Sequence, residues 1–133
     1  MLSALRVTPA AFRAAASGLN DRRGGDRGAT VTFRLNETAT VLFTVQRAVS
    51  GREIDGRCRR DARTHPKAKR CMIWRTVSGS FRVAGKRGAN RLTFTGRIRG
   101  RKLDAGRYHL VARARDMAGI VGRAARARFS IRA

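Results

Sequence analysis

Two cysteines are the residues of this chain whose types and spacing could do the most specific chemistry. Cys58 and Cys71 are separated by twelve residues and do not form a C-x-x-C pair. A disulfide between them would close a loop of about 14 residues and, on a chain-entropy model, would add roughly 3 kcal/mol of stability. The alternatives are two free thiols, or a zinc site with His65 as third ligand and Asp55 or Asp61 as a weak fourth. We expect the disulfide, which implies an oxidising compartment.

Basic side chains crowd the segment around the two cysteines, where they could bind an anion. The candidate anion-binding residues share a long cationic side chain, and they are Arg57, Arg59, Arg60, Arg63, Lys67, Lys69 and Arg70. Asp61 is the one acidic residue among them. Such a patch suits a glycan, a cell-wall polymer, a lipid headgroup or nucleic acid. The plainer interpretation is a solvated loop whose charge prevents edge-to-edge aggregation.

Residue sets that would mark an enzyme are absent from the sequence. The two histidines, His65 and His109, lie in a basic segment and on the polar face of a predicted strand, and neither belongs to a hydrolytic triad. Glu37 and Glu53 are the only glutamates, which disfavours a paired-carboxylate site. Residues 22–28 are rich in glycine and arginine, but no GxxxxGK[ST] motif follows. The aspartates are too scattered for calcium, so the sequence predicts no enzyme, no cofactor and no metal site.

The charge of the whole chain is strongly positive. Its 133 residues carry 31 Lys and Arg against 8 Asp and Glu, which gives a formal net charge of +23. This balance favours a polyanionic partner, which could be nucleic acid, anionic lipid or acidic glycan. The alternative is that arginine decorates solvent-exposed faces in a chain from a GC-rich genome. The scattering of arginine along the whole sequence weakens the first interpretation.

Short segments in which apolar and polar residues alternate dominate the sequence and predict β-strands. In residues 30–35 and 40–46 every second residue is Val, Phe or Leu, and we expect these two segments to form a hairpin or adjacent antiparallel strands. Further strands are predicted at 72–77, 80–83, 91–95, 107–115 and 127–131. Together they predict an all-β sandwich of seven or eight strands in a single domain, residues 1–133.

Two segments depart from this alternation. Residues 51–69 hold glycine, proline and many charges without an apolar period, and they predict a basic surface loop at about 51–70 that the cysteines pin. Trp74, which follows this loop, is expected in the core. Residues 8–16 predict an edge strand interrupted by Pro9, or a short helix capped by Thr8.

The N-terminal residues 1–18 contain no apolar run long enough for a signal peptide or a membrane span. We therefore predict no transmembrane segment. We expect the chain to be the excised or truncated end of a longer secreted protein.

Residues 103–110, with the sequence LDAGRYHL, lead into a strand that ends at 114–116, and they resemble the late strands of fibronectin type III and bacterial immunoglobulin-like domains. The resemblance implies that Tyr108 forms a tyrosine corner, whose hydroxyl bonds back to the preceding backbone. Residues 116–120, with the sequence DMAGI, are similar to the Asp-x-Ala-Gly-Asn turn of the bacterial members, with Ile120 in place of the Asn.

The upstream half is similar to terminal domains in large secreted proteins of high-GC bacteria. The similar segments are 12–13, 29–31, 35–39, 43–45 and 51–52, together with the Cys pair that encloses a basic loop. The resemblance implies an immunoglobulin-like antiparallel β-sandwich with a structural or adhesive role and no catalytic residues.

These observations predict a non-catalytic extracellular or cell-surface module for interaction, adhesion or spacing. Its candidate ligand is an anionic glycan or cell-wall polymer, and its other candidate partners are further domains of a longer parent chain. We expect a monomeric domain. The alternative is a basic nucleic-acid-binding protein, which would have reduced cysteines and a steep salt dependence of binding.

Overall fold

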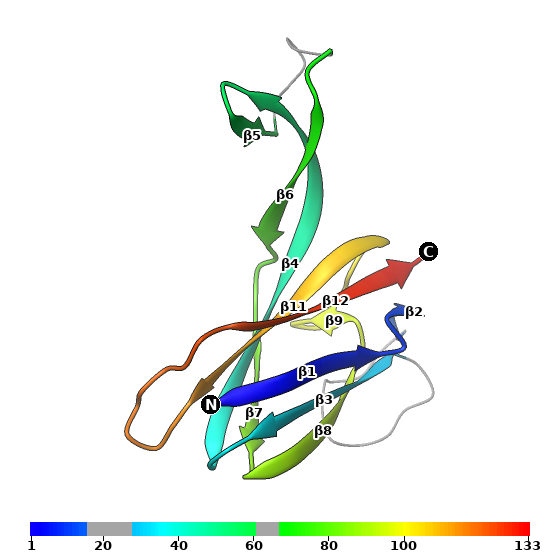
Figure 1. The fold of residues 1–133 in the computed structure, drawn as a ribbon. Helices are drawn as coiled ribbons and strands as arrows, with labels where there is room; N and C mark the ends of the chain where they lie inside the picture. Colours follow the sequence, from blue (N-terminus) through cyan, green and yellow to red (C-terminus); the bar gives the residue numbers. More distant parts are fainter. Residues whose placement is uncertain (16–27, 61–66) are drawn as a thin grey trace.

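The computed structural model describes residues 1–15, 28–60 and 67–133, and this described part of the chain is all-β (Figure 1). Twelve strand segments lie in the described residues. Their bounds are β1 (Leu2–Thr8), β2 (Ala11–Arg13), β3 (Ala29–Leu35), β4 (Ala39–Ile54), β5 (Arg57–Arg59), β6 (Arg70–Thr76), β7 (Phe81–Gly85), β8 (Gly88–Phe94), β9 (Arg97–Ile98), β10 (Arg101–Lys102), β11 (Gly106–Arg115) and β12 (Ala125–Arg132). The prediction of seven or eight strands is too low, because segments as short as β9 and β10 cannot show an alternating pattern.

Two sheets pack face to face, so the predicted β-sandwich is confirmed. The smaller sheet has the order β1-β3-β8 with antiparallel neighbours. The larger sheet runs β2-β12-β11-β4, and β5, β6 and β7 also pair with β4. The apolar faces of both sheets contribute to one buried core.

The predicted pairing of residues 30–35 with 40–46 is wrong. β3 pairs with β1 and β8, whereas β4 pairs with β11 in the opposite sheet. The chain crosses between the sheets at 36–38, so the two apolar faces meet across the core. The rings of Phe33 and Phe43, at most 1% exposed, lie 5.8 Å apart there. Alternation of apolar and polar residues shows which face of a strand is apolar. It does not show whether the next segment pairs with that strand in the same sheet or packs against it from the opposite sheet.

One aromatic cluster joins the two sheets. Phe94 of β8 contacts three rings of the larger sheet, with centroid distances of 6.0 Å to Phe12, 5.8 Å to Phe81 and 5.3 Å to Phe129. Phe129 stacks in turn on Tyr108 at 5.2 Å. Full burial of such a side chain stabilises a fold by about 1.5–3 kcal/mol, so this cluster contributes strongly to holding the sheets together.

The N-terminal segment changes sheet at Pro9. β1 pairs with β3 as far as Thr8, and β2 then runs parallel to β12 at the edge of the larger sheet. Proline has no N–H to continue a ladder, which favours the change at this position. The predicted edge strand within 8–16 is therefore right for β2, and the helical alternative is wrong. β1 itself was not predicted, because a register shift between Ser3 and Arg6 breaks its alternation.

The second half of β4 leaves the sandwich and forms a projecting arm with β5 and β6 (Figure 1). We define the arm as residues 46–54, 57–59 and 70–76. The prediction of a loop at about 51–70 is wrong for 51–54, 57–59 and Arg70, which are strand. No apolar period exists there because the arm has no core to face, and apart from Gly51 none of its described residues is buried.

Candidate anion-binding surface

The disulfide predicted from the sequence is confirmed, and it staples the arm. Cys58 of β5 and Cys71 of β6 are joined by an S–S bond of 2.01 Å, with their Cα atoms 5.9 Å apart. The bond passes close to β4 at Gly51, where a Cβ would lie 2.8 Å from the Cys58 Sγ and 2.6 Å from the carbonyl oxygen of Arg59. Position 51 therefore requires glycine, since a side chain would push β5 away from β4. The free-thiol and zinc alternatives are wrong, because both sulfur atoms are in the disulfide.

The arm brings arginines to one of its faces. Arg52 of β4 lies opposite Arg59 of β5 on one side and Arg70 of β6 on the other. Arg57 shares the face of Arg59, two residues away along β5. We call Arg52, Arg57, Arg59 and Arg70 the arginine row. Directly opposed residues of antiparallel strands have Cβ atoms about 5 Å apart, so like charges here repel. An anion that lies along the row would relieve this repulsion.

The structure places the described anion-binding candidates on this arm or within three residues of it along the chain. Six of them are exposed, namely Arg57, Arg59, Arg60, Lys67, Lys69 and Arg70. Arg63 lies outside the described residues. The segment before β6 is held against β4, because Glu53 N–H donates to the Lys69 carbonyl and the Arg52 guanidinium donates to the Ala68 carbonyl, both at 2.9 Å. Within the described part of the chain, no carboxylate forms an ion pair with these cations.

An aromatic surface continues the arginine row toward the sandwich. Met72 and Trp74 follow Arg70 at alternate positions of β6, so they share its face. Trp74 is 38% and Met72 41% exposed, and the prediction that Trp74 is a core residue is wrong. Trp74 lies on the outer face of the larger sheet, as His109 does, and the smaller sheet does not cover this face. On its other side the indole stacks on His109 of β11, with a centroid distance of 3.6 Å and an interplanar angle of 17°.

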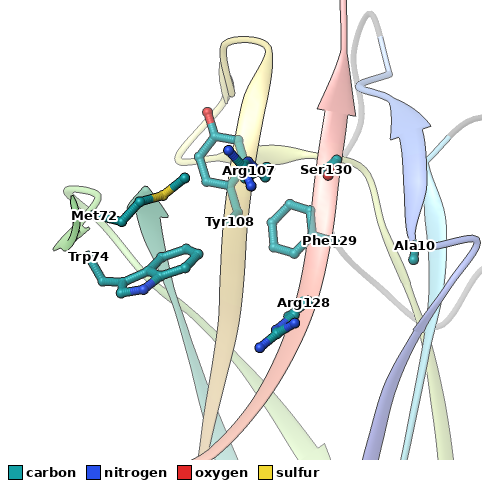
Figure 2. A pocket seen from close by; sticks show the side chains of 8 residues that line it. All are labelled: Ala10, Met72, Trp74, Arg107, Tyr108, Arg128, Phe129 and Ser130. Carbon is teal, nitrogen blue, oxygen red and sulfur yellow. The ribbon is translucent and has the colours of Figure 1, made fainter. Parts of the chain in front are cut away.

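A hollow of about 380 Å³ is lined mainly by residues of β6, β11 and β12 (Figure 2). We call it the Trp74 hollow, and its lining residues are Ala10, Met72, Trp74, Arg107, Tyr108, Arg128, Phe129 and Ser130. Arg107 and Arg128 are exposed and carry the charge of the lining. An apolar wall with a few charged groups is the usual composition of a ligand site. The Trp74 hollow could hold the ring of a ligand against the indole and a negative group of the same ligand against a guanidinium. This hollow was not predicted from the sequence, because its lining residues come from segments that are far apart in the chain.

His109 lies beneath the indole in surroundings that disfavour its protonated form. Burial lowers the pKa of its imidazole, and the positive charges of Arg128 and Arg126 lower it further. The Nδ1 atom is buried and has no hydrogen-bond partner among the described residues. A protonated His109 would be one more cation in an already positive surface, and burial would keep water from solvating its charge.

The lowered pKa of His109 predicts a pH dependence of stability. The unfolded chain binds a proton at the usual imidazole pKa of about 6.5, whereas the folded chain resists it, so the free energy of unfolding should decrease as pH falls through that value. Denaturant unfolding across this pH range should show that the free energy of unfolding decreases less steeply in a His109→Gln variant. His65 and the carboxylates are the same in both proteins, so the difference reports on His109. Identical pH profiles for the two proteins would contradict this role of His109.

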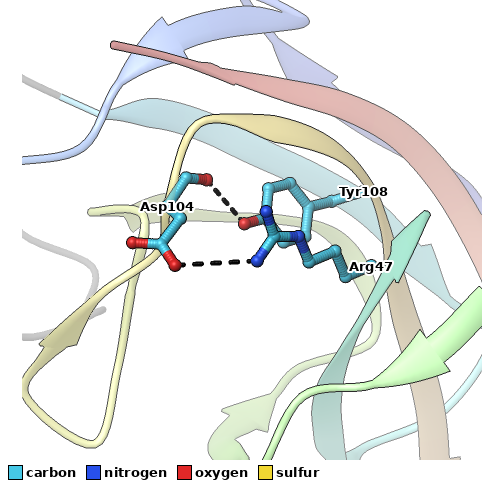
Figure 3. Close-up of polar contacts among 3 residues, drawn as sticks. All are labelled: Arg47, Asp104 and Tyr108. Atoms are coloured by element: carbon cyan, nitrogen blue, oxygen red, sulfur yellow. Dashed lines mark hydrogen bonds and ion pairs between the residues drawn. The ribbon is translucent and has the colours of Figure 1, made fainter. Parts of the chain in front are cut away.

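Tyr108 makes the bond that a tyrosine corner makes (Figure 3). Its hydroxyl donates to the carbonyl oxygen of Asp104 at 2.6 Å, and its ring is 1% exposed. Burial raises the pKa of the phenol, against a lowering by Arg47 and with a smaller raising by Asp104. Arg47 also lies 3.6 Å from the Asp104 carboxylate, a surface ion pair that contributes little by itself. These contacts fix the turn before β11, which makes Tyr108 a structural residue.

Comparison with known proteins identifies no relative of this chain. No protein-family model matches it, and neither the curated proteins nor the solved structures contain a match. No cluster of three or more His, Cys, Asp or Glu that could hold a metal ion lies in residues 1–15, 28–60 and 67–133. The same described residues include no helix long and apolar enough to cross a membrane.

Proposed function

We propose that this chain is a non-catalytic extracellular binding module, with an immunoglobulin-like sandwich that presents an arm to an anionic polymer. The observation that carries the proposal is the continuity of one face. The arginine row leads directly into the Trp74 hollow along alternate residues of β6. Cationic and aromatic groups are thereby aligned on a surface that no described carboxylate neutralises.

The length of this surface favours a polymer over a single small anion. Arg70 and Trp74 are four residues apart on one strand, which corresponds to about 13 Å at the usual rise of a β-strand. One ligand that contacts both the row and the hollow must carry several charges along its length. An acidic glycan or cell-wall polymer could contact both the hollow and the row. Its sugar rings can lie against the indole, and its acidic groups can lie against the arginines.

The disulfide supports the extracellular location, because such bonds persist mainly in oxidising compartments. The two-sheet architecture and the bond from Tyr108 to Asp104 support the immunoglobulin-like assignment. In a longer parent chain the sandwich would space its neighbouring domains, and the arm would reach beyond it to the polymer.

The nucleic-acid alternative has less support. Arginines also occupy the outer face of the smaller sheet, where Arg6, Arg34 and Arg91 are exposed. The charge therefore surrounds the sandwich and is not confined to a groove for a duplex. Proteins that bind single strands use several exposed aromatic side chains for base stacking, whereas Trp74 is the one exposed aromatic residue in the described part of the chain.

Neutralising the arm should weaken polymer binding more than neutralising the opposite face. We expect Arg57→Gln, Arg59→Gln and Arg70→Gln together to lower the affinity for a defined oligogalacturonate about tenfold, or about 1.4 kcal/mol. The matched control is Arg6→Gln, Arg34→Gln and Arg91→Gln, which removes the same charge from the outer face of the smaller sheet. This control should change the affinity by less than about threefold, since distant exposed charges are screened by salt.

Calorimetric titration at several salt concentrations measures both effects. Equal losses in the two triple variants would show that only net charge matters, and the proposed site would be wrong. Tighter binding of a DNA duplex than of an oligogalacturonate of equal charge, at every salt concentration, would favour the nucleic-acid alternative.

A further inference from the structure

The loop between β11 and β12 exposes a group of large apolar side chains. Met117 is 90%, Ile120 67% and Val121 53% exposed. We call these three residues the apolar tip. The loop projects from the end of the sandwich away from the arm (Figure 1). Large apolar residues gathered on one surface of a soluble domain mark an interaction site more often than single exposed ones do.

The apolar tip is held outward by a fixed turn. Asp116 N–H donates to the Ile120 carbonyl at 3.0 Å, and Ile120 N–H donates to the Asp116 Oδ1 at 2.8 Å. Gly119, with φ at +84°, donates its N–H to the Asp116 carbonyl at 3.0 Å. The side chain of Ile120 takes no part in these bonds, so a polar residue could occupy position 120 without loss to the turn. The exposed apolar side chain of Ile120 is therefore not a requirement of the local backbone.

Arginines border the apolar tip. A hollow of about 480 Å³ lies beside it on the outer face of the larger sheet. Its lining residues are Thr40, Leu42, Arg82, Arg113, Arg115, Asp116, Met117, Gly119 and Val121. Arg82, Arg113 and Arg115 are exposed and outnumber the one carboxylate, Asp116. Apolar side chains in a loop, with guanidinium groups beside them, match the acyl boundary and the adjoining headgroups of a bilayer surface.

We propose that the apolar tip inserts into the interface of an anionic phospholipid bilayer while Arg82, Arg113 and Arg115 bind the headgroup phosphates. An apolar protein partner would leave the arginines without a counter-charge, and a soluble polyanion would leave the apolar side chains in water. The bilayer satisfies both groups, since its acyl boundary takes the apolar side chains and its phosphates attract the basic ones. With the tip inserted, the arm points away from the membrane.

Vesicle sedimentation tests this proposal with a tip variant that carries Met117→Ser, Ile120→Ser and Val121→Ser. On vesicles of phosphatidylglycerol and phosphatidylcholine we expect its affinity to be about thirtyfold lower than that of the unchanged protein, or about 2 kcal/mol. A control with Ala89→Ser and Ala105→Ser, two exposed alanines outside the apolar tip, should keep its affinity. Near 1 M salt, where the Debye length is about 3 Å, the unchanged protein should retain binding that the tip variant lacks.

A depth measurement gives an independent readout. A Met117→Trp variant should gain indole emission that brominated acyl chains quench, relative to the unchanged protein, whose Trp74 lies on the arm side. Equal vesicle affinity of the tip variant and the unchanged protein, or an indole at 117 that brominated lipid does not quench, would overturn the proposal. Because the tip variant should bind oligogalacturonate normally, failure here can be told from failure of the proposed polymer site.

Discussion

Replacing Phe94 with alanine is expected to lower the free energy of unfolding by about 3–5 kcal/mol. The Phe94 ring is fully buried and contacts Phe12, Phe81 and Phe129 of the opposite sheet. Its removal would leave a cavity between the sheets, where three rigid rings cannot close together without moving their strands. Domains of this size are stable by about 5–15 kcal/mol in total, so the variant should be close to unfolding at moderate temperature.

Denaturant unfolding followed by circular dichroism measures the effect of Phe94→Ala. The control is Arg91→Ala on the same strand, whose exposed side chain should be worth no more than about 0.5 kcal/mol. A loss for Phe94→Ala that is no larger than that of the control would mean that the aromatic cluster does not join the sheets. Phe94→Leu, which keeps most of the apolar volume, should lie between the two.

Removing the disulfide is expected to affect the arm and to leave the sandwich nearly unchanged. For the double variant Cys58→Ser and Cys71→Ser, the loop-closure contribution lost is about 3 kcal/mol. Gly51 is the one buried residue in the described part of the arm, so the arm can open without exposing the core. We therefore expect amide hydrogen exchange in β5 and β6 to become about a hundredfold faster, as a loss near 3 kcal/mol implies.

Exchange in β3 and β11 provides the internal control, because these strands lie in the core of the sandwich. Their protection should change by less than about threefold. If protection in β3 and β11 fell as much as in the arm, the arm and the sandwich would unfold as one unit. In that case the arm would not be the separately stapled element that we describe.

Strand faces could be predicted from the sequence because each depends on residues close together in the chain. The alternation in 30–35 and 40–46 correctly placed Phe33 and Phe43 in the core. The corner at Tyr108 was also suggested by a local motif, and its hydroxyl reaches Asp104 only four residues away. Each of these features needs no knowledge of which strands are neighbours.

The candidate site could not be predicted as a unit, because it depends on strand register. Arg59, Arg52 and Arg70 meet only when β5, β4 and β6 align around Gly51. Residues 51–69 have no apolar period, because an arm that is exposed on both faces needs none. A loop is therefore predicted there from the sequence. A weak signal was present in the alternation of Arg70, Met72 and Trp74, which places a cation and two apolar groups on one face of a strand.

Lysine acetylation with and without the polymer tests most directly whether the arm is the binding site. The chain has four lysines, of which Lys67 and Lys69 lie beside the arginine row, whereas Lys86 and Lys102 are exposed elsewhere on the sandwich. We predict that saturating oligogalacturonate protects Lys67 and Lys69 from acetylation and leaves Lys86 and Lys102 reactive. Equal protection of all four lysines, or protection of Lys86 and Lys102 alone, would contradict a binding site on the arm.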